Sequence, residues 1–222
     1  LSQIVKPERI VPAIVEFVDI AGLVAGASQG EGLGNQFLSH IRETDAIVNV
    51  VRCFEDENVI HVAGKVDPIS DIEVIQTELC LADLATVEKS LIRYQKVAKA
   101  GQDKEAQRLV DVLKKCQAAL DQALPVRGIP FSKEEQVVLK PLCLITAKPA
   151  MFVGNVAEDG FENNPFLDQL RAYGDKQHAP VVAICAKTEA ELADMSDDDR
   201  LLFLHEMGLE EPGLNRLIRA AF

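Results

Sequence analysis

Short runs of apolar, largely β-branched residues alternate with amphipathic segments along this chain of 222 residues. Apolar runs bounded by Gly, Pro or polar clusters are typical of buried strands in a parallel sheet. They predict strands over residues 13–18, 46–53, 151–156 and 180–185. Because helical segments separate most of these runs, the pattern indicates an α/β fold, a mostly parallel sheet with helices on both faces.

Capping residues and periodic apolar positions predict the helices. Ser132-Lys133-Glu134-Glu135 has the form of a capping box and predicts a helix that runs to about Thr146. Pro165 after Asn164 is typical of a helix start. Further helices are expected over residues 35–41, over 197–207 after Ser196, and from Pro212, the last with Leu214, Leu217 and Ile218 facing inward.

An antiparallel helical hairpin is predicted between the second and third strands. Its first helix is expected to begin at Ile72 with Asp71 as the N-cap. Apolar residues then recur at alternating spacings of three and four on both sides of a break at residues 100–103, which is coiled-coil spacing. Between residues 86 and 116, eight basic and four acidic residues give a net charge of +4. This suits contact with a phosphate backbone, the alternative being an ordinary solvated helix surface.

Composition and charge exclude several classes of protein. The net charge of −12 argues against a protein that coats nucleic acid over its whole surface, and we expect no DNA partner. No apolar run approaches the roughly 18 residues of a membrane span, so we expect no membrane partner. The five cysteines are scattered and never spaced C-x-x-C, as is typical of reduced thiols in a cytoplasmic protein without a zinc site or a disulfide framework.

Polar residues and glycine follow three of the predicted strands. They are Asp19 with Gly22, Asn155 with Glu158, and Ala186 with Lys187. The carboxyl ends of parallel strands meet at one edge of a sheet, where α/β proteins bind nucleotides. An aspartate there can hold Mg²⁺ through a water molecule, and a glycine lets its backbone N–H approach a γ-phosphate. An ordinary polar turn is the alternative for each pair taken alone.

These strand ends resemble, in order, the third, fourth and fifth nucleotide motifs of P-loop GTPases. The stretches 19–46, 155–165 and 208–215, together with the hairpin, are more specifically similar to the YchF/Obg-like ATPase family, a branch of the Obg-related P-loop GTPases. The resemblance covers essentially the whole chain. It implies a nucleotide-binding domain made of residues 1–71 and 131–222, with the helical hairpin inserted over 72–130.

The resemblance also implies parts that we expect this chain to lack. These are the upstream Gly-x-x-x-x-Gly-Lys-Ser/Thr loop that binds phosphates, the first switch region and a C-terminal TGS domain. We therefore expect the fragment alone to be inactive, and the full-length protein to be a Mg²⁺-dependent ATPase that acts as a ribosome-associated switch. Its hairpin is expected to contact the ribosome or rRNA.

The residues after the third predicted strand bear on the choice of base. A guanine-specific Asp accepts two hydrogen bonds from guanine, but Glu158 occupies that place and is one methylene longer. Val156 replaces the usual Lys, and its backbone is expected to contact the adenine edge. Asn155 is expected near the base, with Ala186 and Lys187 supporting it. A preference for ATP, with GTP bound more weakly, is the expected result.

Hydrolysis requires a group that orients the attacking water. A Gln often follows the glycine of the third motif, but Leu23 stands there in this chain. By resemblance His61 takes this role, which imidazole can perform by hydrogen bonding, and a solvated loop histidine is the alternative. Leu23 and the missing phosphate loop also keep a second hypothesis open, a non-catalytic scaffold that binds RNA or protein on a degenerate nucleotide-binding domain.

Overall fold

The computed structural model describes residue 9 and residues 14–20, 33–58, 64–101 and 104–222. Within the range 33–58, side chains are described from residue 38 onward. In the described residues, three strands form one parallel sheet in the order β1-β2-β3. They are β1 (Ile47–Arg52), β2 (Ala150–Asn155) and β3 (Val181–Ile184). Three of the four predicted strands are thus confirmed, with bounds that differ by one or two residues.

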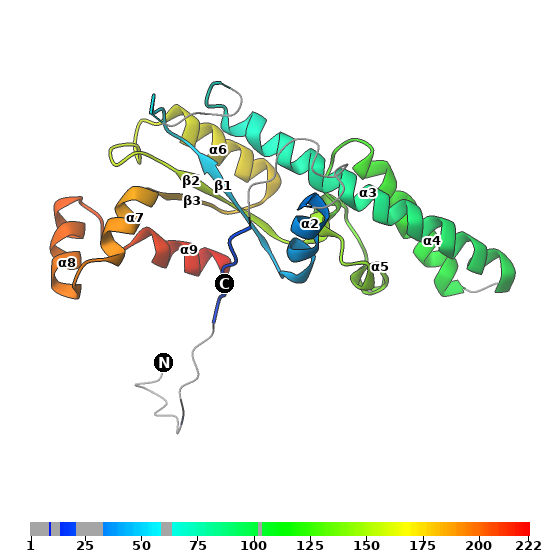
Figure 1. Ribbon diagram of the computed structural model, residues 1–222. Helices are drawn as coiled ribbons and strands as arrows, with labels where there is room; N and C mark the ends of the chain where they lie inside the picture. The colour runs from blue at the N-terminus through cyan, green and yellow to red at the C-terminus, as the bar shows by residue number, and fades with distance from the viewer. Residues whose placement is uncertain (1–8, 10–13, 21–32, 59–63, 102–103) are drawn as a thin grey trace.

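Helices surround this sheet on both faces (Figure 1). The α-helices of the described residues are α2 (Leu33–Glu43), α3 (Pro68–Gly101), α4 (Lys104–Leu120), α5 (Lys133–Leu139), α6 (Pro165–Gln177), α7 (Ala186–Ala193), α8 (Asp197–Glu206) and α9 (Gly213–Ala221). Short 3-10 helices cover Val126–Gly128, Lys140–Leu142 and Ile145–Ala147. The predicted α/β architecture with an inserted hairpin is confirmed. None of the described helices combines the length and apolar character needed to cross a membrane.

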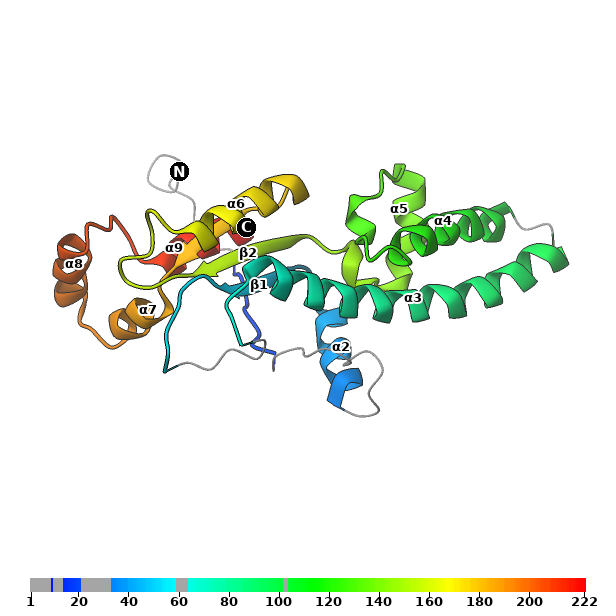
Figure 2. The same ribbon diagram turned by 90° about the horizontal axis from the view of Figure 1, so that it is seen from above.

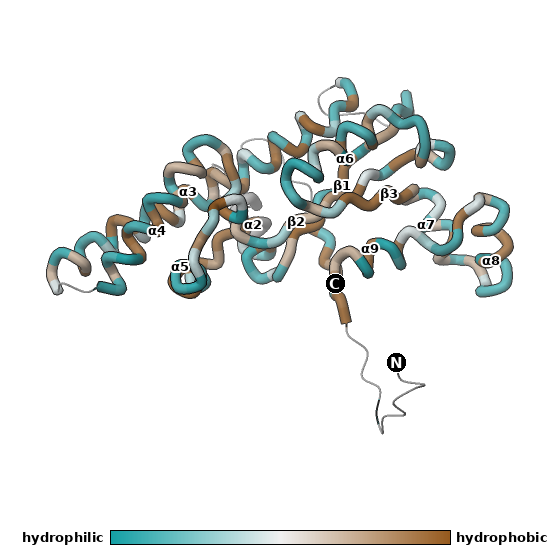
Figure 3. Tube along the Cα trace, turned by 180° about the vertical axis from the view of Figure 1, so that it is seen from behind, coloured by the Kyte–Doolittle hydropathy of each residue, from teal (hydrophilic) through white to brown (hydrophobic). Residues whose placement is uncertain are grey.

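Alternate residues of the central strand β2 supply the two cores. Phe152 faces α6 and packs with Leu167 and Leu170, which are fully buried. Met151 and Val153 face the other side and pack in a cluster against Leu217 of α9. Figure 3 shows the strands as mainly hydrophobic, whereas the helices alternate between hydrophilic and hydrophobic positions. The sheet is therefore buried on both faces over β2, as a parallel sheet requires.

The hairpin of α3 and α4 extends away from the sheet (Figure 2). Its seam consists of the apolar residues that the 3-4 spacing predicts, and these pack in one cluster: Val87, Leu91, Leu109, Leu113, Cys116 and Leu120. The break between the helices also falls where the sequence predicts it, after Gly101.

The long helix begins four residues before its predicted start. Asp67 is the N-cap: its Oδ1 accepts a hydrogen bond from Ser70 N at 3.1 Å, and its carbonyl accepts one from Asp71 N at 3.0 Å. Pro68 takes the first helical position, where its missing N–H costs nothing. Asp71 lies within the first turn, where a carboxylate interacts favourably with the helix dipole. The prediction of Asp71 as the N-cap is therefore wrong.

The capping box at Ser132 is confirmed, but the helix that it begins ends early. Glu135 N donates to Ser132 Oγ at 3.2 Å, and Ser132 N donates to Glu135 Oε2 at 2.9 Å. The helix stops at Leu139 instead of near Thr146 because Pro141 has no N–H for the helical ladder. Cys143 then adopts a left-handed conformation with φ of 47°, which ends the following 3-10 turn.

The predicted strand over 13–18 is not formed in the described residues 14–20. Its apolar residues Ile14, Phe17 and Val18 are exposed. An apolar β-branched run becomes a strand only where a neighbouring strand accepts its backbone hydrogen bonds, and neither neighbour pair of the described sheet includes this segment.

The C-terminal helices also differ in part from the sequence pattern. The helix α7 was not predicted, because its residues were assigned to the end of the strand before it. Helices α8 and α9 begin after Ser196 and Pro212, as predicted. In α9, however, Leu217 packs against the sheet cluster while Leu214 and Ile218 are exposed, so the predicted inward face is wrong at two of its three positions.

A fully buried carboxylate joins the hairpin to the segment that leads into β2. Asp83 of α3 accepts hydrogen bonds from Ile145 N at 2.9 Å and from Thr146 N and Oγ1 at 2.7 Å each. Burial raises the pKa of Asp83, and these hydrogen bonds oppose the increase. The hydroxyl of Thr146 also accepts a hydrogen bond from Val126 N at 3.2 Å, so the segment after the hairpin is tied to the same point.

The same segment holds the end of α2. Lys148 Nζ donates to the carbonyls of Ile41 and Arg42 at 2.7 Å each, and also to that of Thr44. A lysine in this position satisfies carbonyl groups that have no partner within the helix and interacts favourably with the helix dipole. Burial lowers the pKa of Lys148.

We expect Gly174→Ala to destabilise the fold by about 1–3 kcal/mol. A Cβ at this position would lie 2.3 Å from Val181 Cγ2 and 2.9 Å from Ala179 O, so α6 would have to move off β3. This exceeds the gain of about 1 kcal/mol that Ala normally gives inside a helix. The matched control is Gly101→Ala, where no atom lies within 4 Å of the added carbon. Urea unfolding measures the stability of both variants. Equal unfolding midpoints for the two would contradict the packing described.

We expect Asp83→Asn to cost about 1–3 kcal/mol of stability, because the amide NH₂ cannot accept a hydrogen bond and leaves a buried N–H without a partner. Asp121→Asn, an exposed change on the same hairpin, is the control and should stay within about 0.5 kcal/mol of wild type. The midpoints of chemical unfolding measure the stability of both variants and of wild type. A variant at Asp83 as stable as its control would show that the carboxylate does not anchor the hairpin.

Candidate nucleotide-binding site

Two neighbouring strands end side by side at the carboxyl edge of the sheet. Asn155, the last residue of β2, pairs with Ile184, the last residue of β3. Asn155 Oδ1 accepts a hydrogen bond from Ala186 N at 3.0 Å. Cys185 precedes α7 but makes no side-chain cap, so Asn155 supplies an acceptor to the first turn of α7 from the neighbouring strand. This bond fixes the start of α7 to the end of β2.

An ion pair also connects the segments that follow β2 and β3. Lys187 Nζ lies 2.7 Å from Glu158 Oε1. The hydrogen bond and the charge of Glu158 raise the pKa of Lys187. The side chains are 72% and 47% exposed, respectively, so a ligand can reach both. The site therefore presents a donor and an acceptor that are already in contact with each other.

Val156 lies below this edge and not on it. Its side chain is buried in the cluster between β2 and α6. Its backbone N–H donates to Ile184 O at 2.9 Å and so continues the parallel ladder. Any contact of the Val156 backbone with a base is thereby limited to its carbonyl oxygen.

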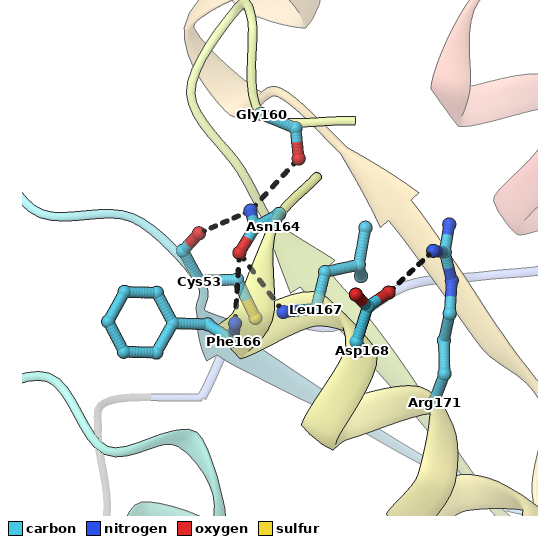
Figure 4. A network of polar contacts seen from close by, with 7 residues as sticks. All are labelled: Cys53, Gly160, Asn164, Phe166, Leu167, Asp168 and Arg171. Carbon is cyan, nitrogen blue, oxygen red and sulfur yellow. Dashed lines mark hydrogen bonds and ion pairs between the residues drawn. The ribbon is translucent and has the colours of Figure 1, made fainter. Parts of the chain in front are cut away.

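Asn164 holds the loop that carries Glu158 (Figure 4). Its Nδ2 donates to Cys53 O and to Gly160 O at 2.9 Å each, and its Oδ1 accepts from Phe166 N and Leu167 N at 3.1 Å. One amide thus joins the residue after β1, the loop after β2 and the start of α6. The sequence predicts that a helix starts after Asn164, but nothing in the local pattern indicates the bond to Cys53, which is distant in the chain.

A second carboxylate at this edge is structural, and sequence reasoning missed it. Glu189 of α7 accepts hydrogen bonds from Gly213 N at 2.6 Å and from Leu214 N at 3.1 Å. It therefore caps the N-terminus of α9 from another helix. The backbone approaches closely here, since a Cβ at Gly213 would lie 2.8 Å from Glu189 Oε1. Pro212 precedes α9 and offers no capping side chain, which was the one signal available in the sequence.

Asp19 does not join these residues. Its neighbour Ile20 packs against a cluster with Ile47, the first residue of β1, whereas Asn155 pairs with Arg52, the last residue of that strand. The side chain of Asp19 is exposed. The strand expected to deliver Asp19 to the carboxyl edge is not formed in the described residues, so the strand prediction is wrong, and the role of Asp19 stays a prediction. Gly22 and His61 lie outside the described residues.

The described residues do not by themselves form a Mg²⁺ site. Among them, no group of three or more His, Cys, Asp or Glu side chains is arranged to hold a metal ion. Proteins commonly bind Mg²⁺ through one or two carboxylates together with the phosphates of a nucleotide. Asp19 is a single exposed carboxylate on a segment away from the other site residues, so we assign no metal chemistry to its present position.

Comparisons with known proteins agree on one family. Residues 4–77 match a family model described as "50S ribosome-binding GTPase". The chain is 56% identical over 222 residues to the "Ribosome-binding ATPase YchF" of Escherichia coli O157:H7 and 46% identical over 225 residues to that of Bacillus subtilis. In both cases all of this chain and 61% of the relative are aligned, so the chain spans less than two thirds of these proteins.

A solved structure has the same fold. The YchF GTPase of Schizosaccharomyces pombe superposes with a TM-score of 0.82 at 31% identity, covering 99% of this chain and 60% of the other. Similarity over the whole chain in sequence and in structure leads to one conclusion: the chain belongs to the YchF family.

Proposed function

We propose that this chain is the nucleotide-binding part of a nucleoside triphosphatase that prefers ATP to GTP and acts as a ribosome-associated switch. The relatives from E. coli and B. subtilis are named ribosome-binding ATPases, which supports both the reaction and the partner. The observation that carries the proposal is the ordered edge at the ends of β2 and β3. There Asn155 and Glu158 from one loop meet Ala186 and Lys187 from the next.

The base is proposed to bind at this edge. Asn155 is already held by Ala186 N, so its amide Nδ2 remains to donate toward a base. Glu158 stands where a guanine-reading Asp stands in P-loop GTPases, and its longer side chain reaches across to Lys187. The carbonyl of Val156 is a further acceptor, suited to the 6-amino group of adenine. These groups favour adenine over guanine because no free carboxylate faces the guanine N1–H and 2-amino group.

The family resemblance supports a proposal for the residues that bind the phosphates. In this proposal Asp19 holds Mg²⁺ through water, Gly22 responds to the γ-phosphate and His61 orients the attacking water. When bound, Mg²⁺ would offset charge on the phosphates. Asp19 would have to leave its described position, near the amino end of β1, to reach them. For this reason we derive no catalytic step from it.

The hairpin is proposed as the ribosome contact. We propose residues 72–130 as the inserted hairpin and residues 1–71 and 131–222 as the nucleotide-binding domain, working in the cytoplasm. All eight basic side chains between residues 86 and 116 are exposed. Lys115 forms an ion pair of 2.6 Å with Glu135. Exposed cations on a protruding hairpin suit the phosphates of rRNA.

We expect the full-length protein to bind ATP more tightly than GTP in isothermal titration calorimetry with Mg²⁺ present. A preference of about tenfold corresponds to about 1.4 kcal/mol, which is the order of one or two hydrogen bonds to the base. A preference for GTP would contradict the interpretation of Glu158. If neither nucleotide bound, the second hypothesis, a non-catalytic scaffold, would replace the enzyme.

We expect the double variant Lys96→Gln/Lys99→Gln to bind ribosomes more weakly than wild type. Because each lysine that contacts a phosphate releases about one counterion, the slope of log affinity against log salt should become shallower by about 2. Ribosome co-sedimentation at several salt concentrations measures this slope. The control is Arg171→Gln/Lys176→Gln, an equal change of charge on exposed positions of α6. If both variants behaved alike, the hairpin would not be the contact.

A further inference from the structure

The ion pair between Glu158 and Lys187 has a role that goes beyond supporting the site. We propose that Lys187 is a positioning residue for base choice: it occupies Glu158 and so reduces the affinity of the site for guanine. This inference rests on the proposed function, since it concerns the same base-binding edge.

The two loops hold the pair in place from both sides. The Asn155 Oδ1 bond to Ala186 N, at 3.0 Å, fixes the residue next to Lys187. On the other loop, Gly160 N donates to Ala157 O at 2.9 Å, and Gly160 O accepts from Asn164 Nδ2 at 2.9 Å. Glu158 therefore lies within a turn whose far end, at Gly160, is bonded to the buried side chain of Asn164. The 2.7 Å contact connects two ordered segments.

Guanine and adenine differ in the hydrogen-bonding groups that they would present to Glu158. Guanine presents two adjacent donors, its N1–H and its 2-amino group, and both oxygens of a free carboxylate can accept from them. In this structure Oε1 of Glu158 is engaged by the ammonium group of Lys187. The ammonium group competes with a base for this oxygen and offsets the charge of the carboxylate. Adenine presents an acceptor at N1 beside its 6-amino donor, so it does not require a free carboxylate.

The size of the effect follows from the exposure of the pair. Both side chains are accessible to water, and exposed ion pairs are weak because water and salt screen them. Guanine can therefore compete with Lys187 at a modest cost, and the lysine biases the choice of base without deciding it alone. Removing the lysine should change the ratio of the two nucleotide affinities by about 2- to 5-fold.

The test measures the ATP and GTP dissociation constants of the full-length protein by calorimetry for wild type and for Lys187→Met, which keeps most of the side-chain length and removes the charge. We expect Lys187→Met to bind GTP relatively better, so that the ratio of the GTP to the ATP dissociation constant falls by about 2- to 5-fold. Lys187→Arg keeps an ion pair with Glu158 and should restore the wild-type ratio. Lys176→Met, at an exposed position of α6, is the matched control and should leave the ratio unchanged.

The same substitution in a Glu158→Gln protein separates a role of Lys187 in base choice from a merely structural role. In a Glu158→Gln protein the carboxylate is absent, so adding Lys187→Met should no longer change the ratio. Equal loss of ATP and GTP affinity in Lys187→Met would show a structural role and overturn the inference, as would an unchanged ratio. Both results leave the proposed function standing. Absence of binding of either nucleotide to wild type would overturn the proposed function and this inference with it.

Discussion

Parallel pairing on both sides of β2 determines where the described elements lie. The strand pairs with β1 from Ala150 to Asn155 and with β3 from Phe152 to Asn155, so its neighbours have little freedom to slide. A shift by one residue would exchange Phe152 and Met151 between the two cores, exposing one face and overfilling the other. The side-by-side position of Asn155 and the start of α7 is thus a consequence of core packing, before any ligand is considered.

The five residues that lead into β2 connect the sheet to two other parts of the protein. Ile145 and Thr146 donate to Asp83 of the hairpin, and Lys148 donates to the carbonyls at the end of α2. These contacts involve charged groups and buried backbone, which are costly to separate. The hairpin, α2 and β2 are therefore held at one junction. A displacement of α2 along its axis would act on the same segment that positions the hairpin.

Local features of the sequence predicted most of the fold, and long-range contacts account for the rest. The capping box at Ser132 and the cap at Asn164 depend on residues within three positions, so they are readable from the chain. The run over 13–18 has the right composition for a strand, but a strand also needs a partner, which composition does not supply. The bond from Asp83 to Thr146 joins residues 63 apart, and the two partners have no local pattern in common. In the candidate site, the sequence identified Asn155, Glu158 and Lys187 but not their mutual contacts.

The short helix α7 bears on two sites at once. Its second residue holds Glu158 at the edge of the sheet, and its fourth residue, Glu189, accepts hydrogen bonds from the first two amides of α9. Lys187 and Glu189 are two residues apart, about half a helical turn, so one short helix carries both contacts. The helix α7 thus connects the sheet edge to α9, whose Leu217 packs in the cluster on the opposite face of β2.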